Sequence, residues 1–130
     1  YQAIKNDVGL GAAAVFNTPT DLIGLYNESI SARKKVFEEN LGGSPSEVEK
    51  NYIAKSPYYW PEKINIPLLI LHYKESENVK AVQSRKLVDK FNEIGYEDYK
   101  AIINSEIDSE FVINRSIEWI KEKTEIPLEM

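Results

Sequence analysis

The sequence has 130 residues, a formal net charge of −5 and a pI of about 5.0, and 42% of its residues are hydrophobic. This length and composition fit one folded domain and exclude a disordered chain. The absence of cysteine excludes disulfides and thiolate metal sites. The one basic run, residues 33–35, is typical of a solvated helix turn, so we expect no nucleic-acid binding.

The longest apolar stretch, residues 64–71, is too short to cross a bilayer, and no apolar leader follows the first residues. We therefore expect no membrane association. The expectation of a cytoplasmic location rests on the absence of cysteine, which is compatible with a reducing compartment.

The first predicted element is a buried strand over the apolar run from Ala12 to Phe16. Residues 18–21 contain proline and aspartate, which predicts a loop after this strand. A helix is expected over residues 30–41, because apolar positions recur among charges and Gly42-Gly43 follows as a stop signal.

A second helix is expected to start at Ser44. Ser44 can cap the helix, Pro45 suits its first position, and Glu47 can complete a capping box. This helix should end near Lys55, because the residue before Pro57 avoids helical geometry.

The clearest strand runs from Ile66 to His72 as a continuous apolar segment, which is typical of a strand covered on both faces. Pro67 cannot donate to a ladder and must lie at its start. A helix is predicted from about Val79 to Ile94, with Gly95 as its stop.

A third strand is predicted over residues 99–103, and Asp108-Ser109 should open a last helix. The order of strands and helices predicts an α/β fold with about three parallel strands flanked by helices. Three strands are few for such a sheet, and the strand at Ala12 lacks an outer partner. The pattern therefore indicates half of a fold.

Four segments then support a family resemblance. Residues 66–84 read similarly to the P-L-L-I-H-G segment, its acid loop and the Q-S pair of prolyl oligopeptidase and acylaminoacyl peptidase relatives. Residues 41–45 and 55–58 are similar to the G-G-x-P and S-P elements of that family. Residues 12–21 resemble the strand and T-D-L turn that follow the nucleophile helix.

The resemblance implies the C-terminal half of a three-layer α/β-hydrolase domain of the serine peptidase type. Residues 1–130 would form a single partial domain, because the G-x-S-x-G nucleophile elbow occurs nowhere in them and would lie upstream. Neither a cofactor nor a metal is expected.

The resemblance also assigns degenerate positions for the catalytic triad. The acid position is Ser76, between Glu75 and Glu77, and the histidine position aligns with Asp108 within a residue. An aspartate with a pKa of about 3.9 is a poor base for a serine hydroxyl, and a serine cannot supply the negative charge that stabilises an imidazolium. No triad is intact, so we predict a catalytically inactive chain, with Glu75 or Glu77 as a substitute acid by a one-residue shift.

His72 is the single histidine, and the resemblance gives it a structural role at the strand end rather than that of a base or metal ligand. Glu75 and Glu77, with Glu106 and Asp108, are expected at one edge of the sheet. They could bind a divalent cation or act as an acid–base pair, but solvated loop carboxylates are the favoured interpretation.

Three functions remain open from the sequence. The chain could belong to a longer pseudo-hydrolase, whose upstream half would be its partner. It could instead be a stand-alone binding domain that completes its sheet by pairing a second copy through the strand from Ala12 to Phe16. A gene remnant or proteolytic fragment without function is the third alternative.

Overall fold

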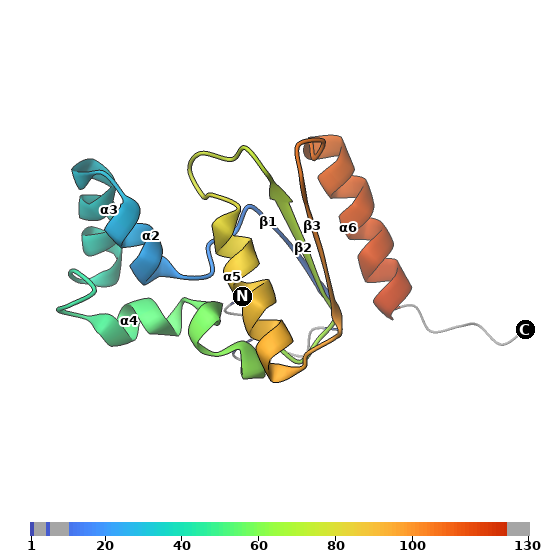
Figure 1. Ribbon diagram of the computed structural model, residues 1–130, viewed down its shortest axis with the longest axis horizontal. Helices are drawn as coiled ribbons and strands as arrows, with labels where there is room; N and C mark the ends of the chain where they lie inside the picture. Colours follow the sequence, from blue (N-terminus) through green and yellow to red (C-terminus); the bar gives the residue numbers. More distant parts are fainter. Residues whose placement is uncertain (2–4, 6–10, 125–130) are drawn as a thin grey trace, which may run out of the picture.

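The computed structural model describes residue 1, residue 5 and residues 11–124. Three parallel strands form the sheet in the order β1-β2-β3: β1 (Ala13–Phe16), β2 (Leu68–Tyr73) and β3 (Tyr99–Asn104) (Figure 1). Leu68 aligns with Ala13 on one side and with Tyr99 on the other. The predicted α/β fold with about three parallel strands flanked by helices is confirmed.

β2 is the centre of the core, and its side chains alternate between the two faces of the sheet. Leu68 and Ile70 face a cluster completed by four buried residues: Trp60, Ile64, Leu87 and Phe91. Leu69 and Leu71 pack against the buried Trp119 on the opposite face. A strand covered on both faces requires the continuous apolar sequence that β2 has.

Two helices supply the layers on either side of the sheet. α5 (Val82–Ile94) contributes Leu87 and Phe91 to one face, and α6 (Ser109–Thr124) contributes Trp119 to the other. Gly95 ends α5 with a φ of 74°, a left-handed conformation that glycine adopts without a steric penalty.

The connection between β1 and β2 folds into a separate helical lobe. α2 (Leu22–Glu28), α3 (Ser31–Leu41) and α4 (Glu49–Ala54) lie to one side of the sheet (Figure 1). They share a small core of four buried residues: Leu22, Leu25, Leu41 and Tyr52. Two short 3-10 turns, η1 (Pro57–Tyr59) and η2 (Pro61–Lys63), return the chain to β2.

One helix was not predicted, and two helices begin later than predicted. Residues 18–21 form the predicted loop, and α2 follows them because the Asp21 side chain caps its first turn. The helix expected from Ser44 begins only at Glu49. The Ser44 hydroxyl does not cap it, because this hydroxyl lies 3.0 Å from the Ser46 hydroxyl. The other bond of the capping box does form: the Glu47 carboxylate accepts from the Ser44 N–H at 3.0 Å. α5 begins at Val82, three residues later than predicted.

A helix must be both long and apolar to cross a bilayer. Across residues 11–124, no helix combines these two properties.

Candidate functional site at the carboxyl edge of the sheet

The carboxyl ends of the three strands are fastened to one another. The Asn17 side-chain oxygen accepts a hydrogen bond from the Tyr73 N–H at 2.8 Å, and the Lys74 N–H donates to the Asn104 carbonyl at 2.8 Å. Asn17 has a φ of 48°, a left-handed conformation that asparagine tolerates better than most residues. In open α/β sheets, ligands bind outside this edge.

Ser76 lies in the turn that follows β2. Its N–H donates to the Tyr73 carbonyl at 3.0 Å, which closes the turn. The turn borders a hollow of about 680 Å³ with both acidic and basic walls, lined by Lys74, Glu75, Ser76, Glu77, Lys80, Ala81, Val82 and Arg85. Ser76 and both flanking glutamates therefore share one hollow.

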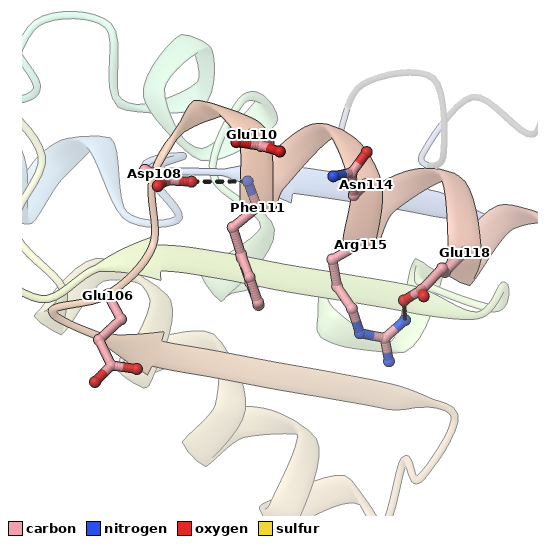
Figure 2. Close-up of a pocket in the computed structure, with 7 residues that line it drawn as sticks. All are labelled: Glu106, Asp108, Glu110, Phe111, Asn114, Arg115 and Glu118. Atoms are coloured by element: carbon pink, nitrogen blue, oxygen red, sulfur yellow. Dashed lines mark hydrogen bonds and ion pairs between the residues drawn. The ribbon is translucent and has the colours of Figure 1, made fainter.

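Asp108 lies in a different hollow, of about 440 Å³, between the β3–α6 loop and α6 (Figure 2). This second hollow is lined by Glu106, Asp108, Glu110, Phe111, Asn114, Arg115 and Glu118. One hydrogen bond links the two loops, from the Ser105 hydroxyl to the Glu75 carboxylate. The structure thus brings Glu75 to the β3–α6 loop but leaves Ser76 and Asp108 lining separate hollows.

The carboxylate of Asp108 caps α6. It accepts a hydrogen bond from the Phe111 N–H at 2.8 Å, as Figure 2 shows. This is the geometry of an N-cap residue, which satisfies one of the free donors at the start of a helix. Asp108 therefore has a structural partner within its own helix.

The acidic residues at this edge do not converge on a common point. Among residues 11–124, no group of three or more histidine, cysteine, aspartate or glutamate side chains is placed to hold a metal ion. The guanidinium of Arg115 lies 3.6 Å from the Glu118 carboxylate in the second hollow.

His72 is fully buried at the end of β2, and both ring nitrogens have partners. Nδ1 lies 2.7 Å from the Ser84 hydroxyl, and Nε2 lies 2.7 Å from the Val79 carbonyl. Because a carbonyl only accepts, Nε2 carries the proton and Nδ1 accepts from Ser84. Burial lowers the pKa of His72 below its usual value, so the ring is neutral near pH 7. This geometry fits a structural histidine.

Known proteins with a similar sequence or structure show which fold this edge of the sheet belongs to. No protein-family model matches the chain. The uncharacterized peptidase YtmA of Bacillus subtilis (strain 168) is 28% identical over 75 residues, which are 58% of this chain and 29% of that protein. The Pyrococcus horikoshii acylaminoacyl peptidase, in its orthorhombic crystal form, superposes on 98% of the chain with a TM-score of 0.76 and 21% identity.

The chain has the fold of part of an acylaminoacyl peptidase. A second solved structure, of acylaminoacyl peptidase in complex with Z-Gly-Gly-Phe-chloromethyl ketone, matches 93% of the chain with a TM-score of 0.66 and 20% identity. The predicted resemblance to prolyl oligopeptidase relatives is therefore confirmed. The chain spans 29% of the curated relative and 22% and 19% of these two solved proteins.

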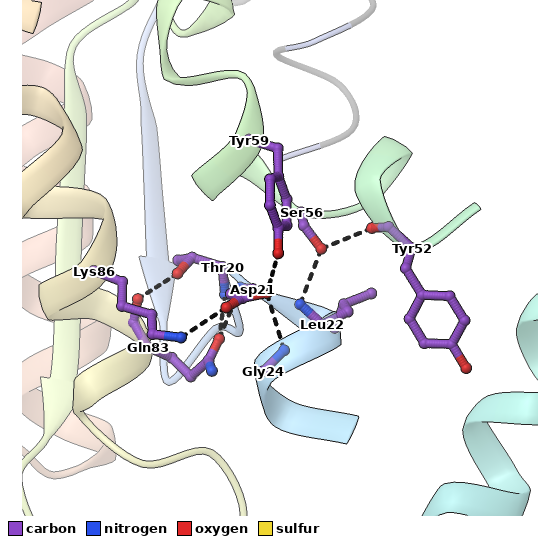
Figure 3. Close-up of polar contacts among 9 residues, drawn as sticks. All are labelled: Thr20, Asp21, Leu22, Gly24, Tyr52, Ser56, Tyr59, Gln83 and Lys86. Carbon is purple, nitrogen blue, oxygen red and sulfur yellow. Dashed lines mark hydrogen bonds and ion pairs between the residues drawn. The ribbon is translucent and has the colours of Figure 1, made fainter. Parts of the chain in front are cut away.

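Within this acylaminoacyl peptidase fold, two of the segments that carry the sequence resemblance bind each other. The Gln83 side-chain oxygen accepts from the N–H groups of Thr20 and Asp21, at 3.0 and 2.8 Å (Figure 3). The Thr20 hydroxyl donates to the Gln83 carbonyl. These contacts fasten the loop after β1 to the first turn of α5.

Asp21 is the charged centre of this network. Its carboxylate lies 2.7 Å from the Lys86 ammonium and accepts from the Gly24 N–H at 3.0 Å and the Tyr59 hydroxyl at 3.1 Å (Figure 3). Burial acts to raise the pKa of Asp21, but the hydrogen bonds from Lys86 and Gly24 outweigh it and hold the pKa below its ordinary value. Asp21 is therefore a buried, ionised and fully partnered carboxylate.

Ser56 extends the network to the helical lobe. Its hydroxyl accepts from the Leu22 N–H at 2.9 Å and donates to the Tyr52 carbonyl at 2.7 Å (Figure 3). In the sequence the T-D-L turn, the S-P element and the Q-S pair are separate segments, and their order does not predict that they meet. One signal was available: Gln83 and Lys86 are three residues apart and lie on one helix face.

Proposed function

We propose that this chain is the C-terminal part of a serine hydrolase-type protein of the peptidase lineage that keeps the scaffold without acid–base catalysis. The observation that carries the proposal is the Asp108 carboxylate, which caps α6 at the position where the resemblance calls for a histidine. Similarity to a curated peptidase and to acylaminoacyl peptidase structures supports the lineage.

The chemistry of the two triad positions supports inactivity. A serine nucleophile needs a neighbouring base that takes its proton near neutral pH and returns it to the leaving group. An aspartate ionises near pH 4 and binds that proton too weakly, by roughly two to three pKa units relative to histidine. Ser76 provides no negative charge, and the nearby Glu75 accepts a hydrogen bond from Ser105.

An activity-based probe tests the proposal directly. The whole polypeptide that carries this segment is treated with a fluorophosphonate, which labels a serine only when a base activates it. We expect no labelling and no turnover of an acylaminoacyl p-nitroanilide above the buffer rate. Labelling of the unmodified protein, abolished by Asp108→Ala, would show that Asp108 acts as the base and would refute the proposal.

A restoration experiment adds the converse test. The double variant Ser76→Asp and Asp108→His replaces both missing groups in the whole polypeptide, and Ser76→Asn with Asp108→Gln is the matched uncharged control. We expect fluorophosphonate labelling in the first variant and none in the second. Equal labelling of both variants would contradict the assignment of these two positions.

A further inference from the structure

A hollow of about 370 Å³ lies beside the turns that lead into β2, whereas Ser76 follows the opposite end of that strand. Its walls come from α4, from η1 and η2, and from Lys5. Figure 1 shows these turns near the end of the sheet where β2 begins. Because small-molecule sites have volumes of roughly 300–1,000 Å³, the hollow is large enough for a small ligand.

Cations dominate the lining of this lysine hollow. Lys5, Lys50 and Lys63 share it with one carboxylate, that of Glu62, so three positive charges against one negative leave a formal charge of +2. The whole chain carries −5, and the hollow at Asp108 has four carboxylates and one guanidinium. Among the described residues, neither Lys50 nor Lys63 forms an ion pair. An anion bound in the lysine hollow would therefore offset the repulsion between its ammonium groups.

Lys5 is held in the wall of the lysine hollow by two contacts. Its Nζ donates to the Ala54 carbonyl at 3.1 Å and lies 5.6 Å from the ring centroid of the buried Trp60. Trp60 is fixed in turn, because its indole N–H donates to the Ile53 carbonyl at 2.9 Å. The bond to Ala54 uses one of the three N–H donors of the ammonium group. Lys5 is therefore a cation already positioned to bind an anion.

Tyr59 adds an aromatic ring to the same hollow. Its hydroxyl donates to the Asp21 carboxylate at 3.1 Å, and its ring meets the Tyr58 ring edge-on, with centroids 5.1 Å apart. These contacts fix the ring, while 39% of the residue stays exposed. A planar group bound in the hollow can therefore stack on Tyr59.

We propose that the lysine hollow binds a small phosphorylated molecule with a planar ring, whose phosphate lies among the three lysines and whose ring stacks on Tyr59. Lysine ammonium groups bind phosphate as point charges. A phosphate monoester carries about −1.5 to −2 charges at pH 7, which matches the formal charge of +2, whereas a single carboxylate would offset only half of it. The hollow contains neither Ser76 nor Asp108, so this inference does not depend on the proposed function.

Titration calorimetry of the whole polypeptide with adenosine monophosphate tests the inference. We expect this probe to bind at least about tenfold more tightly than inorganic phosphate or adenosine, because each of these makes one of the two kinds of contact. Added salt should weaken the binding, since it screens the charges of the lysines. No detectable binding of adenosine monophosphate would overturn the inference, and equal affinity for inorganic phosphate would refute the contact with the ring.

A pair of double variants tests the place of the phosphate. Lys50→Met with Lys63→Met removes two lining ammonium groups and should weaken binding of adenosine monophosphate at least about tenfold. Lys35→Met with Lys121→Met removes two exposed lysines from α3 and α6, makes the same change in net charge, and should leave the affinity within about twofold. Equal weakening by both pairs would show an effect of net charge alone and would overturn the inference.

Two substitutions of Tyr59 test the place of the ring. Tyr59→Phe and Tyr59→Leu both remove the hydrogen bond to Asp21, but only the first keeps an aromatic ring. Affinity for adenosine monophosphate should fall about tenfold in Tyr59→Leu and stay nearly unchanged in Tyr59→Phe, because a stacked base contributes through the ring. Equal affinities in the two variants, with circular dichroism showing that both are folded, would refute stacking on Tyr59.

Discussion

The Gln83 side-chain oxygen accepts a hydrogen bond from the Asp21 N–H at 2.8 Å, across 62 residues of sequence. The same oxygen accepts from the Thr20 N–H, so one buried side chain satisfies two main-chain donors. The loop after β1 has no regular secondary structure to satisfy those donors. Gln83 therefore holds the entry to the helical lobe against α5.

Replacing Gln83 with methionine keeps the length of the side chain and removes the acceptor. Because two buried N–H groups lose their partner, we expect the free energy of unfolding to fall by about 2–4 kcal/mol. Urea unfolding followed by fluorescence of the buried Trp60 and Trp119 measures the loss. Asp89→Met, at an exposed site on the same helix, should change stability by less than about 0.5 kcal/mol, and a similar effect of both changes would contradict the role of Gln83.

The ion pair between Asp21 and Lys86 should affect how the stability of the folded protein depends on pH in the acidic range. The pKa of Asp21 is lowered in the folded protein, so its stabilisation is complete above the unfolded value of about 3.9 and is lost as pH falls through the folded value. In Lys86→Met, less opposes the effect of burial and the pKa of Asp21 rises in the folded protein. The variant should therefore be less stable than the unmodified protein near pH 6 and should lose less stability as the pH falls to 3.

Urea midpoints between pH 3 and 6 measure this shift. Lys100→Met removes an exposed lysine from β3 and is the matched control, whose pH dependence should follow that of the unmodified protein. Identical pH dependence in Lys86→Met and Lys100→Met would show that Lys86 does not set the pKa of Asp21.

Asp108 should contribute to stability through α6. Asp108→Ala removes the acceptor for the Phe111 N–H, and we expect a loss of about 1 kcal/mol in the free energy of unfolding. Asp108→Asn keeps a side-chain oxygen and should retain most of this stability. Equal losses in the two variants, measured by urea unfolding, would show that the cap is not the source of the effect.

His72 should make the folded protein less stable in weak acid. Burial lowers its pKa below the unfolded value of about 6.5, so the folded state binds fewer protons and stability falls as pH drops below that value. His72→Gln has no titrating group and should lose most of the pH dependence between pH 7.5 and 5.5. Since His72 is the single histidine, an unchanged slope in the variant would exclude it as the cause.

Local sequence patterns predicted the helix ends that depend on neighbouring residues and the strand that is buried along its whole length. The apolar run of β2, the glycine after α5 and the Asp108 cap of α6 all appear as predicted. The predicted helix start at Ser44 was wrong. A capping sequence shows which hydrogen bonds can form, but the Ser44 hydroxyl pairs with the Ser46 hydroxyl instead of capping the helix.

The candidate site was harder to predict, because it depends on contacts between distant segments. Ser76 and Asp108 could be assigned to the ends of β2 and β3, but their separation into two hollows follows from the tertiary arrangement of both loops. The helical spacing of Gln83 and Lys86 places both on one face of α5, but it does not identify Thr20 and Asp21 as their partners, because these two lie in an irregular loop.

The central place of β2 has a consequence during protein synthesis. Its Leu69 and Leu71 face α6, the last described helix to leave the ribosome, whereas the other face is covered earlier by α5. Because parallel strands form no local hairpins, the sheet also waits for segments that are distant in sequence. The nascent chain therefore exposes an apolar strand until α6 emerges, and in that interval it is most prone to aggregation.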